Sequence, residues 1–121
     1  MKLLIVDDHA GVRALIRELL CQVASEIYEC SSAEDAVALC ADFEPDCVTM
    51  DFKMSGMDGL TAIRNFKKSG AKDIPILVVT GNVAALEAVK KETSMAGATA
   101  FMSKPFSPDQ LVKEVTRLLP V

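Results

Sequence analysis

Four short apolar runs in this chain each end in a polar residue that can take part in chemistry. The runs span residues 3–6, 47–50, 76–79 and 98–102, and turn or helix signals follow each of them. Short apolar runs of this kind are typical of strands buried in a parallel sheet. The polar residues that follow the runs are, in chain order, Asp7 and Asp8, Asp51, Thr80, and Lys104.

These polar residues are expected to share one pocket, because ligands of an open α/β sheet bind outside the carboxyl ends of the strands. Three of them, Asp7, Asp8 and Asp51, are carboxylates. Carboxylates held this close repel one another, and a hard divalent cation such as Mg²⁺ relieves the repulsion. The sequence therefore predicts a metal site beside Thr80 and Lys104.

Helix signals alternate with strand signals along the whole chain, and a weaker fifth strand is expected at residues 26–30. Right-handed crossovers turn such βα units into a parallel sheet that is covered on both faces. Helices are expected at residues 9–24, from 31 to about 42, from 59 onward, from 83 to about 95, and from 107 onward.

Local signals mark several helix ends and faces. Ser31 and Glu34 resemble a capping box, Gly97 is expected to end a helix, and Ser107 with Pro108 is expected to begin one. The apolar stripe of the first helix is expected to contain Val12, Leu15, Ile16, Leu19, Leu20 and Val23.

Length and composition exclude several classes of protein. The 121 residues suit a single domain over 1–121, and 50% of them are hydrophobic, enough for a core without disulfides. The net charge of −4 argues against direct nucleic-acid binding, and no apolar run approaches the ~20 residues that span a bilayer. A cytoplasmic location is expected, because the apolar start of the chain lacks the pattern of a signal peptide. Cys21, Cys30, Cys40 and Cys47 form no C-x-x-C pair, so they are expected to be buried and reduced rather than part of a zinc or redox site.

Four motifs in order resemble the receiver domain of two-component response regulators, over the entire chain. They are Val6-Asp7-Asp8, Met50-Asp51 with Met54 and Met57-Asp58-Gly59, Val79-Thr80-Gly81, and Lys104-Pro105-Phe106. The resemblance implies a flavodoxin-like, doubly wound (βα)₅ fold whose five parallel strands have the order 2-1-3-4-5. It also implies a signalling phosphoacceptor rather than an enzyme.

The resemblance assigns Asp51 as the phosphoacceptor, which takes a phosphoryl group from a histidine kinase or phosphotransfer protein. Lys104 would contact a phosphoryl oxygen as a point charge, and Thr80 would offer its hydroxyl to the phosphoryl group. Phe101 would act as a rotameric switch, changing the face that a downstream protein target binds. A cis peptide bond between Lys104 and Pro105 is also implied.

The same resemblance implies Mg²⁺, or Mn²⁺, as the cofactor. Asp8 would bind the metal directly, and Asp7 directly or through water. Asp51 and the backbone carbonyl of Lys53 would complete the protein's share of the ligands. Departures from the usual pattern are Ser55, where proline is common, and Lys53, whose side chain could hang over the site and compete for phosphate.

Other functions are less well supported. A phosphohydrolase with an aspartyl nucleophile usually has a second acid two residues later, where this chain has Lys53. A nucleotide- or flavin-binding module would need a glycine-rich loop, which the segment after Asp8 lacks. A degenerate receiver that acts only in protein interaction is disfavoured, because Asp51, Thr80 and Lys104 are all present. His9 could sense pH near the metal, although an exposed loop histidine is the simpler interpretation.

Overall fold

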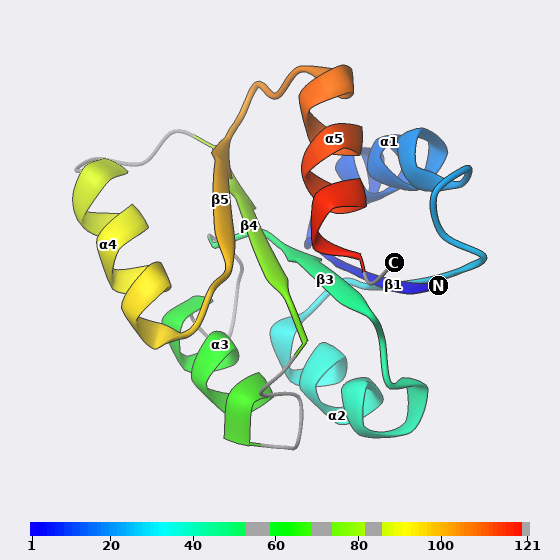
Figure 1. Ribbon diagram of the computed structural model, residues 1–121. Helices are drawn as coiled ribbons and strands as arrows, with labels where there is room; N and C mark the ends of the chain where they lie inside the picture. Colours follow the sequence, from blue (N-terminus) through cyan, green and yellow to red (C-terminus); the bar gives the residue numbers. More distant parts are fainter. Residues whose placement is uncertain (53–58, 69–73, 82–85, 120–121) are drawn as a thin grey trace.

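The computed structural model describes residues 1–52, 59–68, 74–81 and 86–119, with the side chains of Ala41 and Leu86 excepted. Its strands are β1 (Lys2–Val6), β2 (Glu26–Cys30), β3 (Cys47–Met50), β4 (Ile76–Thr80) and β5 (Ala100–Ser103). Its helices are α1 (Ala10–Leu20), α2 (Ala33–Phe43), α3 (Gly59–Lys68), α4 (Leu86–Ala96) and α5 (Pro108–Leu118). The strands form one parallel sheet in the order β2-β1-β3-β4-β5, so the predicted flavodoxin-like topology is confirmed (Figure 1).

Helices lie on both faces of the sheet (Figure 1), and each face has its own core. Successive side chains of a strand point to opposite faces, so Leu3 and Ile5 of β1 join one core while Leu4 and Val6 join the other. The first core is completed by α1 and α5, the second by α2 and α3. With both faces covered by helices, a ligand can reach the sheet at the carboxyl ends of its strands.

Local sequence chemistry explains several helix ends. Ser107 caps α5 by accepting a hydrogen bond from the Gln110 amide, with Pro108 in the first turn, as predicted. Gly97 follows α4 with a φ of +123°, a conformation that glycine adopts without a steric penalty. The predicted capping box of α2 is wrong by one residue, because Ser32, not Ser31, accepts the hydrogen bond, and it does so from Asp35.

Two further expectations are corrected. Leu15 is 46% exposed, because it lies about 100° around α1 from Ile16, the centre of the buried stripe. Cys21 is also exposed, while Cys30, Cys40 and Cys47 are buried and free as expected. Burial raises the pKa of the Cys47 thiol to about 12. Among the described residues, no helix has the length and apolar character needed to cross a membrane.

Candidate functional site

The carboxyl ends of the strands bring together the carboxylates that the sequence analysis singled out. Asp7 directly follows β1, and Asp51 directly follows β3, the central strand. Asp7, Asp8 and Asp51 can each offer one carboxylate oxygen such that these atoms all lie within 4.8 Å of one another. Asp7 and Asp51 are buried, whereas Asp8 is exposed. The cluster is therefore reachable from solvent on the Asp8 side.

Lys104 supplies positive charge to this cluster from the end of β5. Its Nζ lies 3.1 Å from Asp7 Oδ2 and 3.3 Å from Asp51 Oδ2, and its side chain is mostly buried. The Lys104–Pro105 peptide bond is cis, in agreement with expectation. A single ammonium thus bridges two of the three acids.

Asp7 is held in place through every polar atom that it has. Its Oδ1 accepts a hydrogen bond from the His9 amide at 2.8 Å, and its Oδ2 is paired with Lys104. Its amide donates to the carbonyl of Cys30 at 3.1 Å. Its carbonyl accepts a hydrogen bond from Arg13 Nη1 at 2.6 Å. Both carboxylate oxygens and both backbone polar atoms of Asp7 therefore have partners that fix its orientation.

Arg13 is a site residue that the sequence interpretation missed. Besides its bond to Asp7, its Nε lies 3.3 Å from Glu29 Oε1, and Arg17 pairs with the other oxygen of Glu29 at 2.9 Å. The available signal was an arginine one turn into the helix after the acidic pair. A residue that faces neither the core nor open solvent has no periodicity signal of its own.

Thr80 ends β4 with its side chain fully buried, and among the described residues its hydroxyl has no hydrogen-bond partner. Its carbonyl accepts a 2.7 Å hydrogen bond from the Lys104 amide. Thr80 lies opposite Ser103 in the sheet register, so Phe101, two residues earlier on β5, shares its face. Phe101 packs against the core of that face. The two residues expected to form the switch thus lie on neighbouring strands.

Comparison with known proteins identifies the fold's relatives. A family model described as the response regulator receiver domain matches residues 3–116. The chain belongs to this family. It is 30% identical to the chemotaxis protein CheY of Bacillus subtilis, covering 98% of this chain and 97% of that protein. It is 32% identical to CheY of Thermotoga maritima, covering 97% and 96%.

Other relatives of this receiver domain are longer. The chain is 30% identical to the cyclic di-GMP phosphodiesterase response regulator RpfG of Xanthomonas campestris, over 98% of its own length but 32% of that protein.

Among solved structures, the receiver domain of NtrX from Brucella abortus superposes with a TM-score of 0.87 at 28% identity, covering 97% of each chain. Chemotaxis protein CheY4 of Vibrio cholerae gives 0.85 at 28% identity, covering 98% of each.

Not every predicted site residue of the receiver domain can be placed. Lys53 and Ser55 lie outside the described residues, as do Met54, Met57 and Asp58 of the second motif. His9 is exposed and precedes α1 without capping it through its side chain. The structure thus brings together Asp7, Asp8, Asp51 and Lys104, with Thr80 on the adjoining strand end.

Proposed function

We propose that this receiver domain accepts a phosphoryl group on Asp51 from a histidine kinase or phosphotransfer protein of the cytoplasm. The observation that supports this most strongly is the pairing of Asp51 with Lys104 inside a three-carboxylate cluster. In the transfer, an Asp51 oxygen forms a bond to phosphorus while the phosphorus–nitrogen bond of phosphohistidine breaks. The imidazole leaves with the electron pair and takes up a proton.

The donor set fits Mg²⁺, or Mn²⁺, which bind hard oxygen ligands. The three carboxylate oxygens lie within 4.8 Å of one another, close to the span of about 4 Å between opposite ligands of Mg²⁺. Asp7, Asp8 and Asp51 would hold the ion, and Lys53 would add its carbonyl. When bound, the metal offsets the negative charge that phosphoryl oxygens bring into the cluster.

Lys104 would neutralise a second part of that charge. Phosphoryl transfer depends mainly on positioning and electrostatic stabilisation, and a lysine acts on phosphate as a point charge. The Lys104 ammonium already lies within 3.3 Å of Asp51, so only a small movement is needed to contact a phosphoryl oxygen. Receiver domains are phosphoacceptors rather than classical enzymes, and we propose that loss of the phosphoryl group by autodephosphorylation resets this one.

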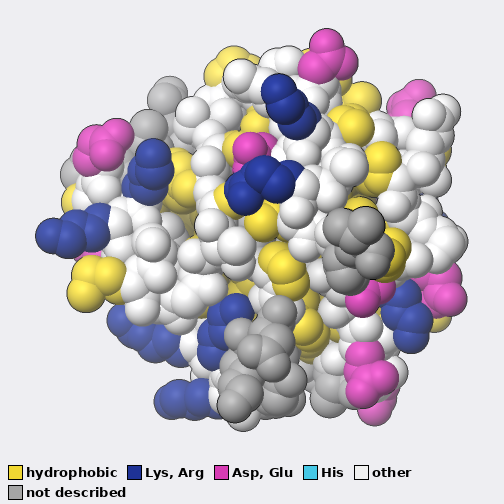
Figure 2. All heavy atoms as spheres, viewed as in Figure 1, with side chains coloured by type: hydrophobic (Ala, Val, Ile, Leu, Met, Phe, Trp, Pro, Cys, Tyr) yellow, Lys and Arg dark blue, Asp and Glu magenta, His cyan; other side chains and the backbone are white. Residues whose placement is uncertain are grey.

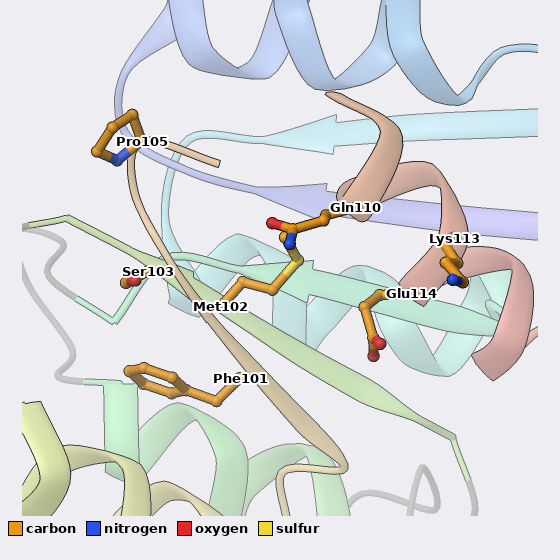
Figure 3. Close-up of a pocket in the computed structure, with 7 residues that line it drawn as sticks. All are labelled: Phe101, Met102, Ser103, Pro105, Gln110, Lys113 and Glu114. Carbon is orange, nitrogen blue, oxygen red and sulfur yellow. The ribbon is translucent and has the colours of Figure 1, made fainter. Parts of the chain in front are cut away.

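The output surface is proposed to be the face formed by α4, β5 and α5. An open groove of about 550 Å³ lies between β5 and α5, and Figure 3 shows Phe101 and Met102 of β5 with Gln110 and Glu114 of α5 along it. Lys90, Lys91 and Lys113 are exposed on the same face. A downstream protein with acidic contacts fits this face.

Phosphorylation would reach this face through Thr80. Within the described ranges its buried hydroxyl lacks a partner, and it would gain one in the phosphoryl group. Phe101 would then turn inward into the vacated space. A modification shifts such an equilibrium only through its different affinity for the two states. The new bond to Thr80 is the source of that difference.

The phosphoacceptor is tested by intact-mass spectrometry after incubation with acetyl phosphate and Mg²⁺. The wild type should gain one phosphoryl group and Asp51→Asn none. The matched control is Asp109→Asn, which changes an exposed acid in the first turn of α5 and should label like the wild type. Labelling of Asp51→Asn to the wild-type extent would remove Asp51 from this role.

The switch is tested by amide NMR with and without beryllofluoride, a mimic of the phosphoryl group. Thr80→Val removes the hydroxyl and keeps the shape, so shifts around Phe101 and Lys113 should shrink. Thr49→Val makes the same change at another buried hydroxyl and should leave these shifts intact. Equal shifts in wild type and Thr80→Val would refute the coupling.

A further inference from the structure

An aromatic hollow at the β2 edge of the sheet has no part in the site described above. Tyr28 of β2 and Phe43 of α2 stack with ring centroids 4.1 Å apart and planes 26° apart, and Tyr28 is 47% exposed. Leu39, Asp42 and Lys2 complete the lining of a hollow of about 180 Å³. The Lys2 ammonium lies 5.5 Å from the Phe43 centroid. The hollow therefore already accommodates one cation over an aromatic face.

The surface around this hollow is acidic. Every charged side chain from Glu18 to Asp51 is acidic. Glu26 is the register partner of Lys2, the exposed Glu44 directly follows Phe43, and the Asp46 carboxylate accepts a hydrogen bond from the Lys2 amide at 2.8 Å.

Positive charge gathers elsewhere on the molecule. Figure 2 shows acidic side chains at the lower right, where α2 leads toward β3, and Lys and Arg side chains at the left and lower left, over α3 and α4. The exposed basic residues of that region include Lys68, Lys90 and Lys91. The two sides of the domain thus attract partners of opposite charge.

We propose that the Tyr28–Phe43 hollow and its acidic rim form a docking surface for a basic, Arg- or Lys-rich segment of a partner protein. An incoming cation would gain from the exposed Tyr28 ring and from the carboxylates together. Access is open, because β2 is the outermost strand of the sheet and, in the part of the chain that the structure describes, pairs only with β1.

This docking surface is remote from the phosphoacceptor. Lys2 begins β1 and Phe43 ends α2, so the hollow lies toward the amino ends of the strands. Asp51 follows the carboxyl end of β3, and the proposed output face lies at the opposite edge of the sheet, around β5. Binding at the hollow is therefore independent of phosphorylation, and a partner held there would stay attached while the output face changes.

The test uses a blocked hexa-arginine peptide as the probe, titrated into the full chain in saturating Mg²⁺ and followed by amide NMR. Shifts should concentrate in β2 and in residues 39–44. Tyr28→Ala should weaken binding about threefold to fivefold, as expected for loss of a cation–π contact at an exposed site, and Tyr28→Phe should restore it. The matched control is Met95→Ala, which removes another exposed hydrophobic side chain and should have no effect.

The charge contribution is tested with the double variant Asp42→Asn/Glu44→Gln, which should also weaken binding. Glu87→Gln/Glu92→Gln changes the net charge equally on α4 and should not. Equal weakening by both pairs would reduce the interaction to general charge attraction and overturn the proposal. If beryllofluoride changed the affinity for the hexa-arginine peptide more than threefold, the proposed independence of this binding from phosphorylation would be wrong. Self-association in sedimentation that Tyr28→Ala abolishes would make the occupant a second copy instead.

Discussion

Arg13 donates a 2.6 Å hydrogen bond to the backbone carbonyl of Asp7. The bond ties the first turn of α1 to the segment that carries two of the three clustered acids. Arg13 also pairs with Glu29 of β2. Through Arg13, the segment with Asp7 and Asp8 is therefore linked to β2 as well as to α1.

Arg13→Ala is therefore expected to weaken Mg²⁺ binding while the domain stays folded. Loss of one hydrogen bond of about 1 kcal/mol corresponds to about a fivefold weaker affinity. Isothermal titration with Mg²⁺ measures it. Arg17→Ala is the control, because Arg17 pairs with the same glutamate while the bond to Asp7 belongs to Arg13. An unchanged affinity in Arg13→Ala would show that this bond does not orient the acids.

Lys104→Met is expected to bind Mg²⁺ more tightly than the wild type and to accept phosphate from acetyl phosphate more slowly. The Lys104 ammonium competes with a metal ion for Asp7 and Asp51, so its removal leaves the acids more attractive to a cation. Without the Lys104 ammonium, less positive charge would stabilise the phosphoryl oxygens during transfer, so phosphorylation would be slower. Titration gives the first effect and the labelling rate by mass spectrometry the second. Weaker Mg²⁺ binding in this variant would contradict the competition.

Thr49→Val is expected to stabilise the domain by about 1 kcal/mol, the lower end of the cost of a buried hydroxyl without a partner. Thr49 lies in the central strand between Ile5 and Leu77, and among the described residues its hydroxyl has no hydrogen-bond partner. Urea unfolding measures the change. Thr93→Val is the control and should give no such gain, because the buried Thr93 hydroxyl bonds to carbonyls of its own helix. A loss of stability in Thr49→Val would point to an unrecognised partner.

The stability of the domain should depend on Cys47 in alkaline solution. Burial raises the pKa of this thiol from 9.0 to about 12, so the folded state resists an ionisation that the unfolded state undergoes. The contribution is fully present below pH 9 and is lost as the pH rises from about 9 toward 12. Between pH 8 and pH 10 the loss is about 1.4 kcal/mol.

Urea unfolding at the two pH values tests this. Cys47→Ala should lose less stability than the wild type over that interval by about this amount. Cys21→Ala, which changes an exposed cysteine, should behave like the wild type. The same pH dependence in Cys47→Ala and wild type would assign the alkaline loss to other groups.

Sequence pattern predicted the parallel sheet and the acidic cluster, because both follow from buried strands that end in polar residues, whereas the strand order came from the resemblance to receiver domains. Asp7, Asp51 and Thr80 could be assigned to the site simply because each directly follows a short apolar run. The pattern could not predict which way Leu15 faces, since that depends on how α1 is rotated against the sheet. It also missed Arg13, whose importance arises from contact with Asp7 and Glu29, and Glu29 is distant in sequence. Tertiary contacts of this kind leave no periodic signal.

Two elements of the proposed output face, α4 and β5, are less deeply buried than the central strands β3 and β4. No residue of β5 is fully buried, and in the described part of α4 only Thr93 is, whereas β3 and β4 are buried throughout. Segments with few buried contacts open with little free energy, and core strands open only when the whole domain unfolds. Asp51 directly follows β3, which is expected to be among the last parts of the domain to open in hydrogen exchange. α4 and β5, which would change on its modification, have fewer buried contacts and are expected to open earlier, so they can rearrange while β3 stays closed.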